Sequence, residues 1–287
     1  MIDILVFSIV IVLLVLLWVI LYDSNRFVVK NYSLESNKIK KDFRAVVLAD
    51  LHNNSYGKNH EHLLAAIRDS HPDMILIAGD LITAKPGVKP DKVLQLLNAL
   101  TAEFPVYYGN GNHEHRLKLY PEIYGNLGEE YQAALKKAGI HLLVNEKEAL
   151  EEWGVCLYGS QIDRYFYKRF GNPQMPEKYL EGLLGSPVSE NYNILLAHNP
   201  DYFPNYAAWG ADLVLSGHVH GGIVRVPFWG KGILSPNIRF FPKYDGGRFT
   251  EGACVMLESR GLGMHTIPLR LFNPGELLVV DFLKQSL

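Results

Sequence analysis

Carboxylate, amide and imidazole side chains follow a series of short apolar runs along this chain. Each of these polar residues comes within a few positions of the end of a run that has the length and composition of a β-strand. In chain order, the run 44–49 is followed by Asp50 and His52, the run 74–78 by Asp80, the run 104–108 by Asn112 and His113, the run 194–197 by His198, and the run 212–216 by His218 and His220.

These side chains share one kind of chemistry. They are oxygen and nitrogen donors without a thiolate, a set that suits Mn, Fe or Zn ions better than a closed structural zinc site. They are too many for one tetrahedral ion and about the right number for two. Residues two positions apart at a strand end point to the same side, so Asp50 with His52, and His218 with His220, are each expected to flank a pair of metals.

Glycines stand beside several of these residues. Gly79, Gly109, Gly111 and Gly217 are expected to let the backbone turn sharply next to the ions. A single Gly-Asp or Asp-x-His is usually ordinary turn chemistry. The whole series, with each motif directly after an apolar run, indicates a functional site.

The elements that must position these residues are strands alternating with helices. The runs are apolar on both faces, which is typical of parallel strands covered by helices. Ligands bind at the carboxyl ends of such strands, so residues far apart in sequence are expected to meet at one edge. The predicted fold is α/β, with two packed mixed β-sheets flanked by helices in a four-layer α/β/β/α sandwich. Further strands are expected at 141–144, 148–151, 155–159, 253–258 and 277–282, and helices at 60–70, 93–100 and 129–138.

The series of motifs resembles that of the calcineurin-like metallophosphoesterases. Their signature runs D-x-H, G-D, G-N-H-[DE], H and G-H-x-H, and each part is present between residues 43 and 285. The segments LADLHNN, SGHVHGG and FPKYDGG make the chain most similar to the membrane-anchored or exported bacterial branch.

The resemblance implies a role for each residue. His113 would be catalytic rather than a metal ligand, contacting the phosphate or protonating the leaving oxygen. Many relatives have an Asp that orients this histidine, and Thr83 stands at that position here. Asp50, His52, Asp80 and His220 would hold the first metal, and Asp80, Asn112, His198 and His218 the second, with Asp80 bridging.

The implied activity is hydrolysis of a phosphoric ester or anhydride bond. A hydroxide held between two divalent ions would attack phosphorus in line. A phosphodiesterase or pyrophosphohydrolase acting on a membrane-associated phosphorylated substrate, a small molecule or a lipid, is the leading hypothesis. The alternatives are a phosphodiesterase of soluble nucleotides or cell-wall phosphates, and a non-catalytic metal-binding scaffold.

Composition narrows the classes further. The net charge is −2 and Lys and Arg never occur more than two in a row, so no nucleic-acid partner is expected. The two cysteines, Cys156 and Cys254, each lie between apolar residues and are expected to be buried thiols.

The N-terminal segment differs from the rest. Residues Ile4 to Tyr22 carry no charge and would extend roughly 28 Å as a helix, close to the thickness of a bilayer core. The expected organisation is a transmembrane anchor at 1–22, a polar basic linker at 23–42 with a short strand near 27–29, and a phosphoesterase domain at 43–287. A cleaved signal peptide is the rival, but a basic start and an A-x-A cleavage pattern are missing.

The charges around this segment predict its orientation. No Lys or Arg precedes the apolar run, whereas Arg26, Lys30, Lys38, Lys40 and Lys41 follow it. The positive-inside rule therefore predicts a single-pass membrane protein with a cytoplasmic catalytic domain. Export of the domain is the alternative.

The sequence also contains two aromatic-rich stretches. One is Tyr165 to Phe170, and the other joins Pro227–Trp229 with Phe240–Pro242. Packing over a sheet edge is the favoured interpretation, and contact with lipid or a greasy substrate is the alternative.

Overall fold

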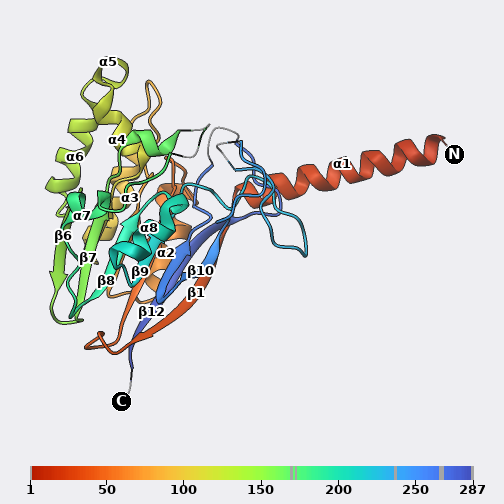
Figure 1. Ribbon diagram of the computed structural model, residues 1–287. Coiled ribbons are helices and arrows are strands. Elements are labelled where there is room, and N and C mark those ends of the chain that lie inside the picture. The colour runs from red at the N-terminus through yellow and green to blue at the C-terminus, as the bar shows by residue number, and fades with distance from the viewer. Residues whose placement is uncertain (1, 169–170, 172, 236–237, 265–267, 286–287) are drawn as a thin grey trace.

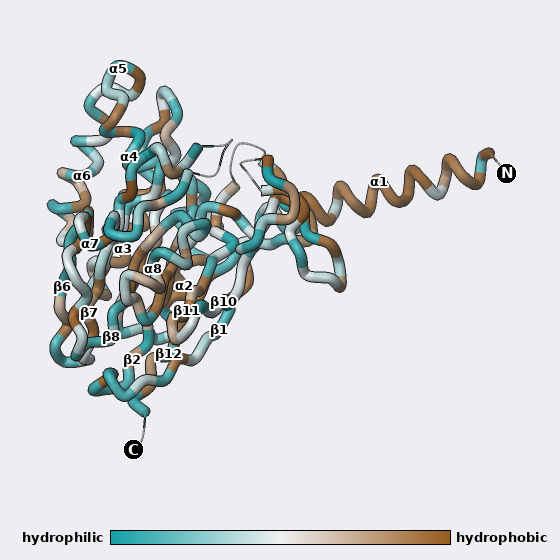
Figure 2. Tube along the Cα trace, viewed as in Figure 1, coloured by the Kyte–Doolittle hydropathy of each residue, from teal (hydrophilic) through white to brown (hydrophobic). Residues whose placement is uncertain are grey.

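A long helix, α1 (Ile2–Ser24), projects from a body of strands and helices (Figure 1). This computed structural model describes residues 2–168, 171, 173–235, 238–264 and 268–285. Hydrophobic residues run along almost the whole of α1, and no residue of its apolar window is buried against the body (Figure 2). The helix is long and apolar enough to cross a membrane, and a signal sequence would have the same properties.

The first sheet carries the early strands and the last one. Its order is β1-β12-β2-β3-β4-β5, and its neighbours are parallel except for the antiparallel pair β12 and β2. The strands are β1 (Phe27–Ser36), β2 (Phe43–Leu48), β3 (Met74–Ala78), β4 (Val106–Gly109), β5 (His141–Leu143) and β12 (Gly275–Lys284).

The second sheet has the order β10-β11-β9-β8-β7-β6, with parallel pairing from β11 to β7 and an antiparallel strand at each edge. Its strands are β6 (Glu146–Leu150), β7 (Val155–Ser160), β8 (Tyr192–Ala197), β9 (Leu213–Ser216), β10 (Gly247–Glu251) and β11 (Cys254–Glu258).

Three apolar clusters divide the domain into four layers. In β2, Val46 and Leu48 face a cluster shared with helices, while Ala45 and Val47 face a cluster shared with the second sheet. A third cluster covers the outer face of the second sheet. The strands are thus apolar on both faces because each face is buried, and the predicted four-layer α/β/β/α arrangement of two mixed sheets is confirmed.

The helices lie outside the sheets. The helices α2, α3, α4 and α6 contribute to the cluster on the first sheet, and α7 and α8 to that on the second. Their bounds are α2 (Glu61–Asp69), α3 (Asp91–Thr101), α4 (Asn112–Leu119), α5 (Pro121–Tyr124), α6 (Leu127–Lys137), α7 (Tyr179–Leu184) and α8 (Phe203–Trp209), with short 3₁₀ turns at Lys58–His60, Arg164–Tyr167 and Pro200–Tyr202.

Residues 23–42 form part of the fold, where a linker was expected. The strand β1 has ten residues and pairs along its whole length with β12, from Phe27 opposite Gly275 to Ser36 opposite Lys284. The expectation of a short strand near 27–29 underestimated it, because alternating polar residues on an edge strand resemble a solvated linker. Cys156 and Cys254 are buried and not bonded to each other, as expected.

The end of α1 is fixed to the domain. Asp23 and Ser24 are buried. Asp23 Oδ2 accepts a hydrogen bond of 3.1 Å from the backbone of Asn273, and Ser24 Oγ accepts one of 3.2 Å from the backbone of Arg270. Only Asn25 and Arg26 lie between the helix and β1, which begins at Phe27.

Candidate metal centre

The predicted site residues meet where the carboxyl ends of the two sheets come together. They follow β2, β3 and β4 of the first sheet and β8 and β9 of the second. Parallel strands present these ends at the same edge, so the packing of the two sheets brings the residues together.

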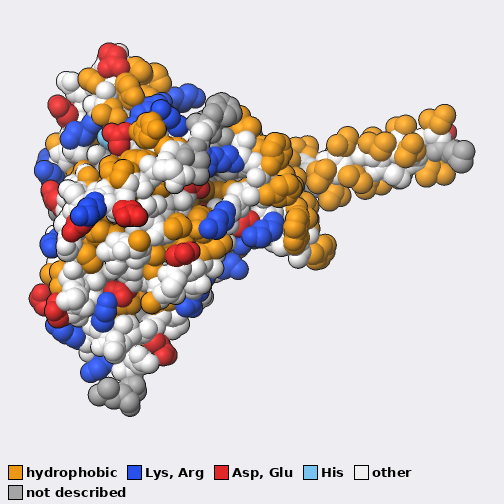
Figure 3. Space-filling view, in the orientation of Figure 1, with side chains coloured by type: hydrophobic (Ala, Val, Ile, Leu, Met, Phe, Trp, Pro, Cys, Tyr) orange, Lys and Arg blue, Asp and Glu red, His pale blue; other side chains and the backbone are white. Residues whose placement is uncertain are grey.

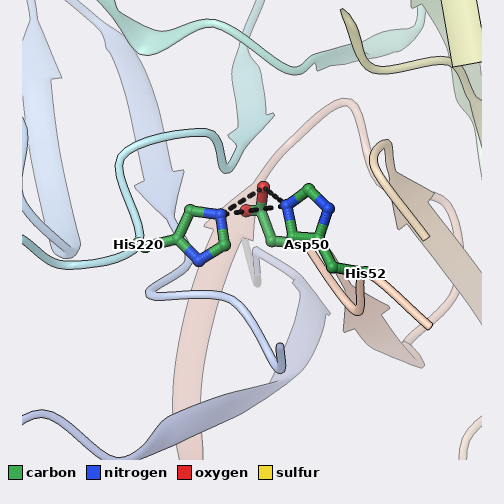
Figure 4. Close-up of side chains that lie close together, drawn as sticks. All are labelled: Asp50, His52 and His220. Atoms are coloured by element: carbon green, nitrogen blue, oxygen red, sulfur yellow. Dashed lines mark hydrogen bonds and ion pairs between the residues drawn. The ribbon is translucent and has the colours of Figure 1, made fainter. Parts of the chain in front are cut away.

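Asp50, His52 and His220 form one group, and their side chains point toward one another (Figure 4). His220 Nε2 lies 3.3 Å from Asp50 Oδ1, and His52 Nε2 lies 3.7 Å from the same oxygen. The two Nε2 atoms are 3.1 Å apart. All three residues are buried, and three ligand atoms this close together could hold one metal ion.

Asp80, His198 and His218 form a second group beside the first. His198 Nε2 lies 3.0 Å from Asp80 Oδ2, and His52 Nε2 of the first group is 4.0 Å from that oxygen. Asp50 Oδ1 is in turn 3.7 Å from His198 Nε2. The carboxylate of Asp80 therefore belongs to the second group and lies next to His52 of the first, with which it forms a further possible ligand group that includes His113.

Asn112 adds an unsatisfied oxygen. Its Oδ1 is buried and accepts no hydrogen bond from any residue that the structure describes. Leaving a buried carbonyl oxygen unpaired costs about 1–3 kcal/mol, so such an oxygen normally has a partner. A cation would satisfy it, which fits the expected ligand set.

The electrostatics of the site also favour a cation. Burial by itself would raise the pKa of Asp50, yet His220 and His198 hold that pKa well below its ordinary value. Burial would also raise the pKa of Asp80, yet His198 and His113 hold that pKa well below its ordinary value. Although burial opposes protonation of His198, the two carboxylates raise its pKa to about 10. A proton on His198 thus compensates the buried negative charge, and divalent ions would replace it.

Several of these residues have unusual backbone angles. Values of φ between about 48° and 75° occur at Asp50, His52, Asp80, His218 and His220. Non-glycine residues adopt this left-handed region at a cost of about 1–3 kcal/mol, and they cluster at functional sites. The expectation that residues two apart share a strand face was therefore wrong in its geometry, because these residues lie in left-handed turns just beyond the strands. His218 joins Asp80, while His220 joins Asp50.

Backbone groups hold the two carboxylates. Asp80 Oδ1 accepts a hydrogen bond of 2.7 Å from the N–H of His113, and Asp50 Oδ2 accepts one of 2.9 Å from that of His218. A Cβ atom at Gly111 would lie 2.2 Å from Asp80 Oδ1, and one at Gly217 would lie 2.3 Å from Asp50 Oδ2. These two glycines are thus required for close approach.

The expected role of the neighbouring glycines in sharp turns applies at Gly79 alone. Its φ is 91°, whereas Gly109, Gly111 and Gly217 are not among the described glycines with positive φ. Sequence reasoning identified the positions but assigned three of them the wrong reason.

Glu114 is a functional residue that sequence reasoning missed. It is buried, and its carboxylate accepts hydrogen bonds of 2.9 Å from the N–H of Asp80, 2.9 Å from that of Leu81 and 3.0 Å from that of Gly111. The hydroxyl of Tyr108 donates a further bond of 2.7 Å. Burial and the nearby Asp80 raise the pKa of Glu114 to about 7. The acidic residue that ends G-N-H-[DE] was the available signal.

His113 has a backbone partner. Its Nδ1 accepts a hydrogen bond of 2.7 Å from the N–H of Ala84. Because Nδ1 is an acceptor, the ring proton belongs on Nε2, which lies 3.9 Å from Asp80 Oδ2. Thr83, at the position of the orienting Asp in many relatives, places its Oγ1 3.3 Å from Nδ1 of His52 instead. The amide of Ala84 orients His113 here.

A cavity of about 460 Å³ opens beside His113. Two cationic side chains, Lys85 and Arg116, contribute to its wall. Its other lining residues are His52, Asn53, Thr83, Ala84, Val88, His113 and Met264.

Tyr167 borders the second metal group. Its ring centroid lies 5.2 Å from that of His218 and 6.4 Å from that of His198. Burial raises the pKa of Tyr167 well above its ordinary value, so the hydroxyl keeps its proton. Sequence reasoning noticed the aromatic stretch but did not place it at the site, and positions 169–170 of that stretch lie outside the described residues.

Comparison with known proteins identifies the family. The family model for calcineurin-like phosphoesterases matches residues 43–222. The chain is 29% identical over 243 residues to the metallophosphoesterase YkuE of Bacillus subtilis, covering 83% of this chain and 78% of that protein. It is 30% identical over 260 residues to a metallophosphoesterase of Campylobacter jejuni, covering 88% and 62%. A 5'-nucleotidase precursor of Thermus thermophilus aligns with a TM-score of 0.43 at 12% identity, covering 84% and 55%.

The chain belongs to the calcineurin-like phosphoesterase family. It is a metal-dependent hydrolase of phosphoric esters, and the clustered donors described above are its candidates for binding divalent metal ions.

Proposed function

We propose that this phosphoesterase binds two divalent ions and cleaves a diester or pyrophosphate bond in a membrane-associated phosphorylated substrate. The observation that carries the proposal is the position of Asp80, whose carboxylate belongs to one buried group of donors and lies next to His52 of the other. Asp50, His52, Asp80 and His220 would hold one ion, and Asp80, Asn112, His198 and His218 the other. Mn, Fe or Zn would suit these donors.

The chain's own residues support a hydrolytic step. Bound divalent ions lower the pKa of a coordinated water and neutralise charge on phosphate oxygens. His113 would present its Nε2–H as a hydrogen-bond donor to the leaving oxygen and stabilise the charge that develops there, because the amide of Ala84 occupies Nδ1. Glu114 holds the backbone on which Asp80 and Gly111 lie, so it keeps the site in position.

The cavity beside His113 supports a substrate with more than one anionic group. Lys85 and Arg116 lie in its wall, and the proposed ligand His52 lines the same cavity. Nε of Arg116 is buried and has no hydrogen-bond partner among the residues described. A second phosphate or an ester substituent would find cationic partners there.

A panel of substrates tests the activity. The purified protein is stripped with a chelator, reloaded with Mn²⁺, Fe²⁺ or Zn²⁺, and assayed on nitrophenyl phosphate, bis-nitrophenyl phosphate and a nucleotide pyrophosphate. We expect no turnover after stripping and faster cleavage of the diester or pyrophosphate than of the monoester. Arg116→Ala should reduce that preference. Full turnover by the stripped protein would overturn the proposal.

The membrane placement is part of the same proposal. We place α1 across the bilayer and the catalytic domain in the cytoplasm, because the cations near the helix all follow it. Protease treatment of intact spheroplasts tests this placement. Protection of the domain until lysis is expected, and digestion without lysis would reverse the orientation.

A further inference from the structure

Five aromatic side chains stand exposed on the surface near α1. We call Phe228, Trp229, Phe240, Phe241 and Phe272 the aromatic rim. Phe228 is fully exposed, and Trp229, Phe240, Phe241 and Phe272 are exposed to 65%, 69%, 57% and 38%. The favoured interpretation of the segments 227–229 and 240–242, packing over a sheet edge, was wrong for these side chains. A contiguous exposed apolar patch normally marks an interaction site.

A hairpin presents the most exposed members of the rim. The N–H of Ile223 donates to the carbonyl of Leu234, and the N–H of Ile233 to that of Val224, each at 2.7 Å. Phe228 and Trp229 lie at the tip, and the ring centroid of Trp229 is 6.1 Å from that of Phe241. The hairpin is thus held at its base and carries its aromatic residues outward.

Hydrogen bonds join the base of this hairpin to the end of α1. The N–H of Arg225 donates to the carbonyl of Leu271 at 3.0 Å. The neighbouring backbones of Arg270 and Asn273 bond the side chains of Ser24 and Asp23. Figure 1 shows a loop projecting beside the domain end of α1, and Figure 3 shows hydrophobic side chains gathered around that point.

The domain end of α1 carries aromatic and cationic side chains, as the rim hairpin does. Trp18 and Tyr22 stack with ring centroids 5.4 Å apart, and the guanidinium of Arg26 lies 4.6 Å from the ring centroid of Tyr22. Aromatic rings followed by a cation are typical of the zone where a helix leaves the bilayer. The side chain of Lys231 in the hairpin is 49% exposed and could reach anionic headgroups.

We propose that the aromatic rim is a second membrane contact, which inserts into the lipid headgroup zone beside the point where α1 leaves the bilayer. The occupant of this surface is the bilayer, because the rim is continuous with the end of the helix and shares its aromatic and cationic chemistry. This inference rests on the proposed membrane placement of α1. The fixed joint at Asp23 and Ser24 prevents the domain from tilting freely away from the lipid.

The backbone links the rim to the metal centre. The hairpin begins at Ile223, three residues after His220. The side-chain amide of Asn273 donates to the carbonyl of His220 at 2.8 Å and also to that of Gly222. The rim hairpin is therefore bonded to the segment that carries His220, a proposed metal ligand.

Site-specific fluorescence tests this contact in the full-length protein reconstituted into phosphatidylcholine–phosphatidylglycerol vesicles. A polarity-sensitive dye is attached to Trp229→Cys, with Ile123→Cys as the matched control and Leu14→Cys as a reporter for α1. Cys156 and Cys254 are buried, which limits labelling there. Ile123 is 50% exposed and lies in α5, far from α1 in Figure 1.

We expect the dye at position 229 to shift to the blue and to lose most of its emission when brominated lipids are included. The dye at position 123 should keep its emission. If position 14 is quenched and position 229 is not, the rim proposal is overturned while the anchor stands. If the dye at position 14 is not quenched, both the rim proposal and the membrane placement of α1 are contradicted. A blue shift at 229 without lipid quenching would indicate a second copy of the chain on the rim, which also overturns the proposal.

Hydrolysis of bis-nitrophenyl phosphate by the same preparations separates this inference from the proposed activity. An active protein with an unquenched dye at 229 contradicts the rim alone. An inactive protein with a quenched dye contradicts the proposed activity alone.

Discussion

The metal centre and the aromatic rim are exceptions of opposite kinds to the rule that polar side chains are exposed and apolar side chains are buried. The centre buries ionisable side chains such as Asp50 and Asp80, and the rim exposes aromatic side chains such as Phe228 and Trp229. Buried polar groups and exposed apolar patches are the informative exceptions in a folded domain. Buried polar groups and exposed apolar patches both lower stability, so both are expected where a protein binds a ligand or a partner.

The two regions differ in how firmly their side chains are held. Backbone N–H groups bind both carboxylates of the centre, and Glu114 fixes the loops that carry them. The tip of the rim hairpin packs little of its aromatic surface against the domain. Substitutions in the centre should therefore alter chemistry and metal binding, whereas substitutions in the rim should alter neither.

The largest effect is expected at Asp80. Asp80→Ala removes the carboxylate that belongs to one group of donors and lies next to His52 of the other, so metal content and hydrolysis should both be lost. Elemental analysis and turnover of bis-nitrophenyl phosphate measure the two losses. Asp69→Ala, an exposed acid at the end of α2, is the control. Normal metal content in Asp80→Ala would remove the basis for a shared ligand.

His113→Asn should separate chemistry from metal binding. The rate should fall about 10²–10³-fold, the usual range for loss of a hydrogen-bond donor to a developing oxyanion, while metal is retained. A substrate with a nitrophenol leaving group should show a smaller defect, because that oxygen needs little assistance. His71→Asn, at an exposed position outside the site, serves as the control. Loss of metal from His113→Asn would make this residue a ligand.

Glu114→Gln tests the support beneath the centre. A glutamine oxygen can accept some of the N–H bonds from Asp80, Leu81 and Gly111, but its amide nitrogen cannot. Metal affinity or activity should fall about 10–100-fold. Metal titration compares the metal affinity of this variant with that of the control Glu130→Gln, at an exposed position. Equal affinities would show that the hydrogen bonds of Glu114 are not needed for metal binding.

Two truncations test the joint between α1 and the domain. A chain lacking residues 1–22 keeps Asp23 and Ser24 and should be soluble and active. A chain lacking residues 1–30 loses both contacts, part of β1 and the packing of Phe27 on Tyr56. Its free energy of unfolding should fall by about 3 kcal/mol or more. Equal stability of the two truncated chains in denaturant titrations would show that β1 contributes little.

The smallest effect is expected at the rim. Phe228→Ser combined with Trp229→Ser removes side chains that contact mostly solvent. The free energy of unfolding should stay within about 0.5 kcal/mol of the parent, and turnover of a soluble diester should be unchanged. A marked loss of stability would mean that the rim packs against the domain. The rim would then not differ from the metal centre in how firmly its side chains are held.

Local patterns predicted much of the fold and the residues gathered at the site. Apart from β1, the expected strands and helices begin and end within two residues of the observed ones, for example 74–78 at β3 and 155–159 at β7. The apolar runs that lead into the site are buried on both faces, so their composition is enough to identify them as strands. Asp50 and His198 follow such runs directly, and Asp80 follows one after Gly79. The direction of the strands is enough to place them at one edge.

Contacts between distant segments could not be predicted in this way. The bond from Ala84 to His113 and the approach of Tyr167 to His218 depend on how the loops fold over the sheets. The strand β1 was underestimated because its partner, β12, lies at the other end of the chain. The exposure of Phe228 and Trp229 was the less favoured alternative, because aromatic runs usually pack inside a domain.

The position of β12 determines when the first sheet can form. This strand lies between β1 and β2, so residues 275–284 must insert between two strands synthesised long before. At about 5–20 residues per second, translation leaves roughly 10–50 s between β2 and β12. During that interval the facing edges of β1 and β2 are open to wrong partners. Folding is therefore expected to be slow and aggregation-prone until the chain is released from the ribosome, and Asp50, which follows β2, reaches its final position only when β12 inserts.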